Sequence, residues 1–280
     1  MRDESTPGAA PRGRWHANLR RRAIKPEREP LPTRVQDLPS LPAAFAHALD
    51  RGLTGLGLEL DAAAREAVDG HARLLLAWTH AINLTAIRDP AAVATAHVLD
   101  SLTAIPWFRA TGAGRILDLG SGGGYPGLPL AAALPGAAVT LLEPIGKKAA
   151  FLRVVAEATG LGDRVTVVAG RAEGVAADPS LRGSWSVVTA RAVASMADLV
   201  ELAFPLLETG GALVAWKRGD LDAELATARR AMHALGGGTL QVEDVAVEGL
   251  FDHRLVIATR TGRVPDEYPR DPAARRRQPW

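Results

Sequence analysis

The chain has 280 residues, 47% of them hydrophobic, which is enough for a full core and excludes global disorder. Its 33 lysines and arginines nearly balance 31 acidic residues, so the formal net charge is only +2. The absence of cysteine excludes disulfides, thiolate zinc sites and a cysteine nucleophile, and no apolar run approaches the roughly 20 residues that span a bilayer. We therefore expect a cytoplasmic protein without membrane contact or a metal site.

The two ends of the chain are rich in arginine. Residues 1–38 also carry proline and glycine without hydrophobic periodicity, which predicts a disordered basic extension. Residues 262–280 are expected to form a basic C-terminal tail. Basic ends around a nearly neutral body can contact a polyanion such as RNA. They can equally be solubilising tails, and composition alone favours that second interpretation.

The next segment has helical periodicity. Apolar residues recur every three or four positions from Leu41 to about Ile87. Asp89-Pro90 then has the pattern of an N-cap followed by proline at the first helical position, and predicts a helix toward Ile105. We expect these helices to form an N-terminal helical cap over residues 39–110.

Beyond residue 110, short β-rich runs alternate with helical stretches. This alternation predicts a parallel sheet covered on both faces. The last two strands have no helix between them, so we expect a hairpin that places one antiparallel strand in a seven-stranded sheet. The predicted strands are 115–119, 138–142, 165–169, 186–189, 212–216, 240–247 and 254–259, and the predicted helices are 128–133, 147–159, 196–207 and 222–235. The fold class is therefore α/β and Rossmann-like, with this domain over residues 111–261.

The first predicted strand runs into a loop with five glycines, where backbone can approach a ligand closely. Gly122, Gly124 and Gly127 satisfy the G-x-G-x-x-G pattern of dinucleotide sites. Two features favour S-adenosylmethionine instead. Asp118 would repel a pyrophosphate but attract an ammonium group, and Pro126 removes a backbone N–H that a phosphate would need.

Four later residues extend the candidate site. Glu143 ends the second strand. Its separation from the glycine loop along the sequence is typical of a carboxylate that binds ribose hydroxyls. Ala172 and Glu173 follow the third strand, where contacts to the adenine edge are expected. Arg191 stands after the fourth strand, where methyltransferases of exocyclic amines usually carry an Asn/Asp-Pro-Pro-aromatic stretch. An arginine there suits an acceptor that is already nucleophilic, such as a purine N7, although spacing alone allows a surface guanidinium equally well.

Several short stretches occur together and in one order between about residues 70 and 260. They are Asn83-Leu-Thr-Ala-Ile87, His97-Val-Leu-Asp-Ser-Leu102, Asp118-Leu-Gly-Ser-Gly-Gly-Gly-Tyr-Pro-Gly-Leu-Pro-Leu130, Leu141-Leu-Glu143, Lys147-Lys-Ala-Ala-Phe-Leu152, Arg171-Ala-Glu173, Ala190-Arg-Ala192 and Ala215-Trp-Lys217. In these stretches the chain resembles the RsmG family, also called glucose-inhibited division protein B. The combination of His-x-x-Asp-Ser with the Tyr-Pro-Gly-x-Pro loop is specific to that resemblance.

The resemblance implies transfer of a methyl group from S-adenosylmethionine to N7 of a guanine in the 530 loop of 16S rRNA. Because the sulfonium methyl is already electrophilic, this in-line transfer depends mainly on positioning. The partner would be the RNA or the small ribosomal subunit, in the bacterial cytoplasm. We expect a monomer.

The resemblance also assigns roles to residues. It places Gly120 and Tyr125 on the methionine side of the cofactor, and Asp118 and Gly122 of the same loop are further candidate cofactor-binding residues. It places ribose at Glu143, adenine at Ala172 and Glu173, and both cofactor and acceptor at a catalytic Arg191. His97, Asp100 and Ser101 would lie beside the pocket as substrate-binding residues. Phosphate contacts could come from Lys147, Lys148, Lys217 and Arg218, for which a solvated face is the alternative.

The chain departs from the family pattern in a few places. Glu143 replaces the more usual aspartate, Arg218 is inserted after Lys217, and the sequence after Tyr268-Pro-Arg270 is different. Two other functions remain open: a methyltransferase of small molecules or proteins, and a non-catalytic RNA-binding assembly factor. The intact glycines and the two acids count against the last of these.

Overall fold

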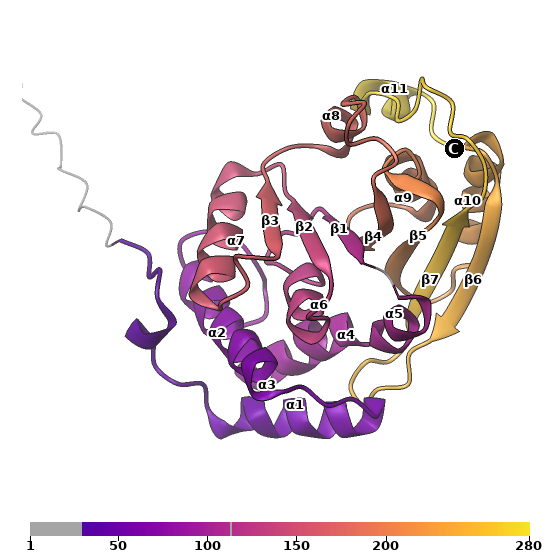
Figure 1. Ribbon diagram of the computed structural model, residues 1–280. Coiled ribbons are helices and arrows are strands. Elements are labelled where there is room, and N and C mark those ends of the chain that lie inside the picture. The colour runs from indigo at the N-terminus through magenta and orange to yellow at the C-terminus, as the bar shows by residue number, and fades with distance from the viewer. Residues whose placement is uncertain (1–29, 113) are drawn as a thin grey trace, which may run out of the picture. The chain divides into compact units, whose positions relative to one another are not determined.

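The computed structural model describes residues 30–112 and 114–280, and a seven-stranded sheet runs through it (Figure 1). The strand order is β3-β2-β1-β4-β5-β7-β6, and β7 runs opposite to the other six strands of this sheet. The strands are β1 (Arg115–Leu119), β2 (Ala138–Leu142), β3 (Val165–Val168), β4 (Trp185–Arg191), β5 (Leu207–Arg218), β6 (Gly238–Asp244) and β7 (His253–Arg260). The predicted fold class is therefore confirmed, including its single antiparallel strand.

Each face of the sheet has its own hydrophobic core, because successive side chains of a strand point to opposite sides. Ile116 and Val187 pack in one core, whereas their neighbours Leu117 and Val188 pack in the other. The first core is closed by α6 (Gly127–Ala133), α7 (Gly146–Ala158) and the N-terminal helices, and the second by α8 (Ala172–Ala176), α9 (Met196–Ala203) and α10 (Asp222–Ala234). Burial on both faces explains why the central strands are almost continuously apolar.

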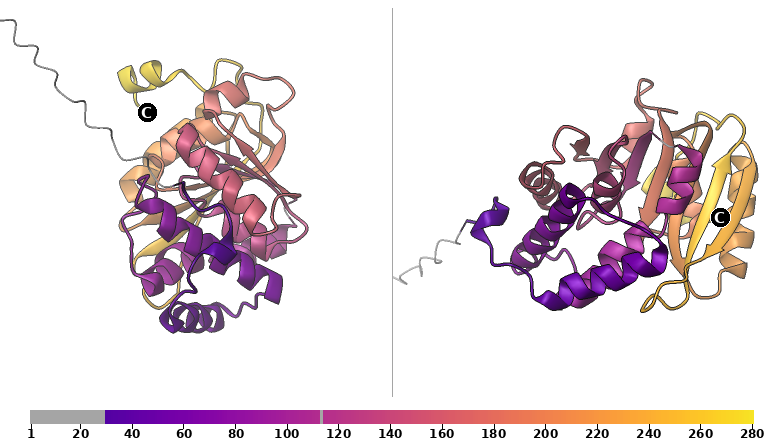
Figure 2. Two further views of the ribbon diagram at one scale, coloured as in Figure 1. Left: turned by 90° about the vertical axis from the view of Figure 1, so that its left-hand side faces the viewer. Right: turned by 60° about the horizontal axis from the view of Figure 1, so that its bottom comes forward.

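The N-terminal helices gather on one side of the sheet (Figures 1 and 2). They are η1 (Val35–Asp37), α1 (Ala43–Leu56), α2 (Ala62–Thr79), α3 (Pro90–Val93), η2 (Ala94–Leu99), α4 (Asp100–Leu102) and α5 (Ile105–Thr111). Asp89 accepts a hydrogen bond from the Ala92 N–H at 2.8 Å and Pro90 begins α3, as the sequence predicts. No helix in residues 30–112 or 114–280 is long and apolar enough to cross a bilayer.

The helix predicted from Pro90 toward Ile105 is not uniform. Its middle, η2, is a π-helical segment that is followed directly by α4. Such segments widen the helix and often occur at functional sites. In this chain the π-helical turn carries His97 and leads into Asp100.

The sequence predicts that residues 31–38 belong to a disordered extension. In the structure these residues instead pack against α2. The Trp78 indole N–H donates to the Pro32 carbonyl at 2.7 Å, and the Arg73 guanidinium donates to the Leu38 carbonyl. Val35 packs on the same core. Two donors on α2 thus find acceptors in this segment, a long-range contact that composition does not reveal. The earlier part of the predicted extension lies outside the described residues.

Candidate active site

The glycine loop joins the end of β1 to α6, at the point where the strand order reverses between β1 and β4. Such a reversal opens a crevice at the carboxyl ends of the strands. Gly120 and Gly122 have φ angles of 73° and 54°, which favour glycine, and a Cβ on Gly120 would lie 3.0 Å from Val193. The loop therefore presents backbone, without side chains, to this crevice.

The Asp118 carboxylate is fully buried beneath the loop. It accepts hydrogen bonds from the Thr189 hydroxyl at 3.0 Å and the Gly127 N–H at 3.3 Å. Burial raises the pKa of Asp118 to about 6, and these hydrogen bonds act in the opposite direction. The carboxylate thus joins β1, β4 and α6 and remains partly protonated in mildly acidic solution.

Glu143 follows β2 and connects the loop to the next turn. Its Oε2 accepts from the Gly122 N–H and its Oε1 from the Ile145 N–H, each at 2.8 Å, and the residue is only 3% exposed. A carboxylate has about four acceptor positions, so two remain for hydroxyl donors. The longer side chain of glutamate is therefore compatible with a ribose contact.

Three aromatic rings stack beside the loop. Tyr125 lies between His71 of α2 and His97 of η2, with ring centroids 4.3 and 4.8 Å away. The Arg191 guanidinium lies 5.4 Å from the centroid of the Tyr125 ring. This stack connects the helical cap to the glycine loop and to the end of β4.

Both histidines of the stack are neutral near pH 7. Burial lowers the pKa of His71 to about 3, while burial and the nearby Arg191 charge lower that of His97 to about 4. His71 Nε2 lies 2.7 Å from the Gly123 carbonyl oxygen, so Nε2 carries the proton and donates it. The Tyr125 hydroxyl is buried and makes no hydrogen bond with the part of the chain that the structure describes.

Arg191 is held at the end of β4 by groups of the helical cap. Its Nη1 donates to Asp100 Oδ2 at 2.9 Å and to the Ala96 carbonyl at 3.0 Å, and its Nη2 lies 3.3 Å from His97 Nδ1. The other carboxylate oxygen of Asp100 lies 2.7 Å from Nδ1 of His253. Groups of the protein itself therefore fix the direction of the guanidinium.

A cavity of about 440 Å³ opens next to this network. Arg191 and His97 belong both to its wall and to the group around Tyr125, so the cavity adjoins the glycine loop. The lining residues are Ile87, Ala96, His97, Asp100, Arg191, Ala192, Trp216, Lys217, Arg218 and His253. Its wall combines apolar side chains with cationic ones, which suits a flat, electron-rich acceptor.

The structure brings together most of the residues that the sequence suggests. Gly120, Gly122 and Tyr125 belong to the glycine loop, while Glu143 and Asp118 accept hydrogen bonds from the backbone N–H groups of Gly122 and Gly127. Arg191 and His97 lie at the adjoining cavity. Ala172 is buried at the start of α8, and Glu173 beside it is bound by Arg275. Lys148 lies in the first turn of α7 and is half-buried.

Three of the suggested substrate-binding residues have their polar atoms bonded to other groups of the protein. Ser101 is completely buried and its hydroxyl donates to the His97 carbonyl at 2.6 Å, so it is not available to a substrate. The Lys217 ammonium is bound by Glu224 at 2.6 Å and by the Ala194 carbonyl. Asp100 is 3% exposed, with both carboxylate oxygens occupied. These side chains complete the internal contacts of the site.

Sequence reasoning missed three residues of this site. His71 holds the glycine loop, and Trp216 Nε1 donates to the Asp100 carbonyl at 2.6 Å. His253 opens β7, directly opposite Arg218 at the end of β5. The hairpin prediction contained the signal for His253, because the first residue of an antiparallel strand lies at the edge where the parallel strands end.

These residues fit S-adenosylmethionine. The backbone-lined loop, the buried Asp118, the acceptor positions left on Glu143 and the orphaned Tyr125 hydroxyl meet the needs of a cofactor with ammonium, ribose and sulfonium groups. Fold and site together define an S-adenosylmethionine-dependent methyltransferase of the doubly wound α/β class.

Sequence similarity to proteins of a known family supports this class. Residues 64–253 match the family model described as rRNA small subunit methyltransferase G. The chain is 43% identical over 218 residues to the ribosomal RNA small subunit methyltransferase G of Roseiflexus castenholzii, covering 78% of this chain and 92% of that one. With its Chloroflexus aggregans counterpart it shares 46% identity over 197 residues, covering 70% and 82%. The chain belongs to this family, which confirms the resemblance read from its motifs.

One solved structure supports the fold. An O-methyltransferase from Bacillus cereus in complex with SAH superposes with a TM-score of 0.51 over 76% of this chain and 97% of that chain. The two sequences are 19% identical, so the likeness concerns the fold alone.

Proposed function

We propose that this protein methylates the RNA of the small ribosomal subunit, at N7 of a guanine in the 530 loop. Membership of the rRNA small subunit methyltransferase G family supports the RNA substrate. The choice of guanine N7 rests on the Arg191 guanidinium, which Asp100 fixes between the glycine loop and the adjoining cavity. Its free donors match the O6 acceptor that neighbours N7 on guanine.

The residues of the site then have distinct tasks. S-adenosylmethionine supplies, when bound, an electrophilic methyl group. Asp118 favours the ammonium group by its charge, and Glu143 accepts hydrogen bonds from the ribose hydroxyls. Glu173 and Ala172 meet the adenine. Tyr125 and the glycine loop enclose the methionine side and exclude water from it.

Guanine N7 carries an exposed lone pair, so its methylation requires no proton to be removed by the protein. The site agrees with this requirement, because His71 and His97 are both engaged in stacking and hydrogen bonds. Arg191 is left to orient the base and to keep N7 in line with the methyl group. Alignment of this kind can account for several orders of magnitude in rate.

The helical cap and the methyltransferase domain divide the work in this proposal. Residues 111–261 hold the cofactor, while residues 39–110 supply His97 and Asp100 to the acceptor side. Arg218, exposed at the edge of the cavity, and Lys148 are candidates for phosphate contacts. The partner is then the small ribosomal subunit or its RNA in the bacterial cytoplasm, and the protein acts as a monomer.

The test uses small ribosomal subunits from a bacterium that lacks this modification. They are incubated with the full-length protein and S-adenosylmethionine labelled in its methyl group, and labelled N7-methylguanine is mapped by chain cleavage at that base. Label at one guanine of the 530 loop is expected, with about 100-fold less in Arg191→Ala. Absence of label, in a preparation that binds S-adenosylhomocysteine, would refute the proposal.

A further inference from the structure

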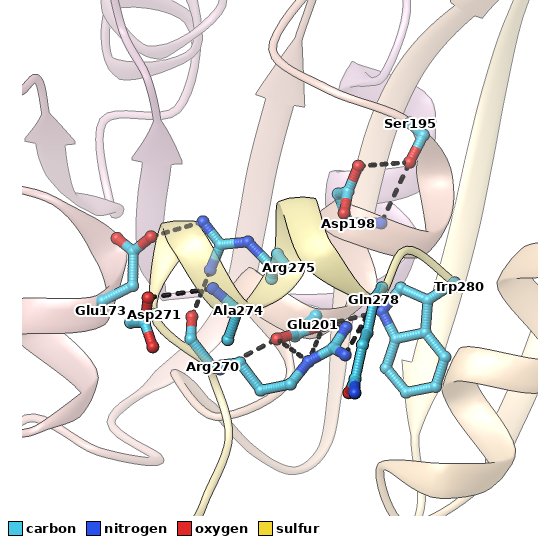
Figure 3. A network of polar contacts seen from close by, with 10 residues as sticks. All are labelled: Glu173, Ser195, Asp198, Glu201, Arg270, Asp271, Ala274, Arg275, Gln278 and Trp280. Atoms are coloured by element: carbon cyan, nitrogen blue, oxygen red, sulfur yellow. Dashed lines mark hydrogen bonds and ion pairs between the residues drawn. The ribbon is translucent and has the colours of Figure 1, made fainter.

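The C-terminal segment, residues 268–280, folds back onto α8 and α9 and contains α11 (Pro272–Arg277) (Figure 3). We call this segment the C-terminal hook. Its sequence is where the chain departs from the family pattern, and composition alone predicts no more than a basic tail. Two of its arginines are instead bound to acidic side chains of the methyltransferase domain.

The hook is anchored on one buried carboxylate. Glu201 of α9 is 0% exposed and accepts hydrogen bonds from the Arg270 side chain, from the Arg270 backbone N–H and from Trp280 Nε1. The Arg270 guanidinium also lies 4.9 Å from the centroid of the Trp280 ring and 5.8 Å from that of Tyr268. Both ends of the hook therefore meet at a single point of α9.

The middle of the hook reaches α8. Asp271 caps α11 by accepting from the Ala273 and Ala274 N–H groups, which orients the short helix. Arg275 then donates from Nη1 to the Arg270 carbonyl at 2.7 Å and from Nη2 to Glu173 Oε1 at 2.5 Å (Figure 3). The Arg275 and Glu173 side chains are only 13% and 18% exposed, so solvent screens this pair weakly.

Glu173 is the acid that the proposed function places at the adenine of the cofactor. Arg275 occupies Oε1, and no donor of the described residues bonds to Oε2. A charged partner on one oxygen fixes the plane of the carboxylate, and the other oxygen stays free to accept. The exocyclic amine of adenine is a donor that such an oxygen can bind.

We propose that Arg275 is a positioning residue for cofactor recognition: the C-terminal hook holds Glu173 so that its free oxygen accepts from the adenine amine. This inference rests on the proposed function, which assigns Glu173 to the adenine. It gives the end of the chain a task in ligand selection, in addition to its packing on α9.

Calorimetric titration tests this with two ligands. S-adenosylhomocysteine carries the adenine amine, whereas S-inosylhomocysteine has a carbonyl oxygen in its place. Arg275→Met should weaken S-adenosylhomocysteine binding about fivefold or more and leave S-inosylhomocysteine binding unchanged. Arg276→Met is the matched control, because Arg276 is the next residue of α11 and is exposed. It should bind both ligands like the wild type.

A general loosening of the fold would weaken the binding of both ligands equally, and that result would overturn the proposal. Wild-type affinity for both ligands in Arg275→Met would overturn it as well. Arg275→Gln, which removes the charge but keeps a side-chain donor, should show the same discrimination in weaker form and serves if the methionine variant does not fold. These titrations contain no RNA. Loss of methyl transfer to ribosomal subunits would therefore contradict the proposed function without altering their outcome.

Discussion

His253 Nδ1 lies 2.7 Å from Asp100 Oδ1, although 153 positions separate the two residues in the sequence. The other oxygen of Asp100 binds Arg191 at 2.9 Å. One carboxylate therefore connects the helical cap to the ends of β4 and β7. The direction of the Arg191 guanidinium thus depends on a strand that pairs with neither β4 nor the cap.

Replacing His253 should destabilise the protein through Asp100. In His253→Leu the Oδ1 atom of a buried carboxylate loses its donor, and we expect the free energy of unfolding to fall by about 1–3 kcal/mol. His253→Asn keeps an N–H close to the same place and should lose much less. Urea unfolding followed by circular dichroism measures both variants. Equal stability of the two would mean that the Asp100 contact contributes nothing specific.

Arg191→Lys should lose most of the turnover even though it keeps the charge. The guanidinium donates in two directions at once, to Asp100 and to the Ala96 carbonyl, which a lysine ammonium cannot reproduce in the same plane. We expect kcat for methylation of small subunits to fall about 100-fold, with the KM for S-adenosylmethionine changed much less. A lysine variant with wild-type kcat would show that turnover depends only on the charge of Arg191.

Acid should destabilise the fold through the stacked histidines. The pKa of His71 is lowered to about 3 in the folded protein, against 6.5 in an unfolded chain. Between these values only the unfolded state takes up the proton. The stability that this group contributes is thus complete above pH 6.5 and decreases as pH falls, by up to about 1.4 kcal/mol per pH unit. His97 acts in the same direction, whereas Asp118, with its raised pKa, acts oppositely between about pH 6 and 4.

The variant His71→Phe isolates this effect, because phenylalanine keeps a ring beside Tyr125 and cannot titrate. At pH 7.5 it should be about 1 kcal/mol less stable than the wild type, since the Gly123 carbonyl loses a donor. Between pH 6.5 and 5 its stability should decline less steeply. Denaturant unfolding at several pH values gives both slopes, and parallel curves would contradict the assignment.

Cofactor affinity should depend on the protonation of Asp118. Burial raises the pKa of this carboxyl to about 6, and the ammonium group of the ligand favours its ionised form. S-adenosylhomocysteine should therefore bind more tightly as pH rises from 5 to 7, by up to about tenfold per unit below pH 6. Asp118→Asn should bind weakly and without this dependence. Calorimetry between pH 5 and 7 measures these affinities. A wild-type affinity that does not change with pH would rule out a direct electrostatic role of Asp118.

Removing one charge of the buried Arg270–Glu201 ion pair should destabilise the protein more than removing both charges. Arg270→Met leaves the fully buried Glu201 carboxylate uncompensated and should lower the free energy of unfolding by about 3–5 kcal/mol. The double variant Arg270→Met with Glu201→Leu should recover most of this loss. Thermal and denaturant unfolding compare the two. A double variant as unstable as the single one would show that the hook depends on specific hydrogen bonds rather than on charge balance.

Local patterns were sufficient for the architecture and the cofactor. The order of strands and helices follows from hydrophobic periodicity, which each segment carries within itself. β1 and β2 begin and end where the sequence predicts, because runs buried on both faces are almost purely apolar. The glycine loop, Asp118 and Pro126 likewise lie within ten consecutive residues, so the choice of S-adenosylmethionine over a dinucleotide needed no distant contact.

Tertiary structure alone decided which polar side chains remain free. Asp100 and Lys217 look equally available in the sequence, yet Arg191 and His253 occupy the first and Glu224 binds the second. The basic ending looks like a solvated tail until Glu201 is found buried beneath it. The reason is physical: a buried charge must be paired, and its partner is chosen by proximity in the fold rather than in the sequence.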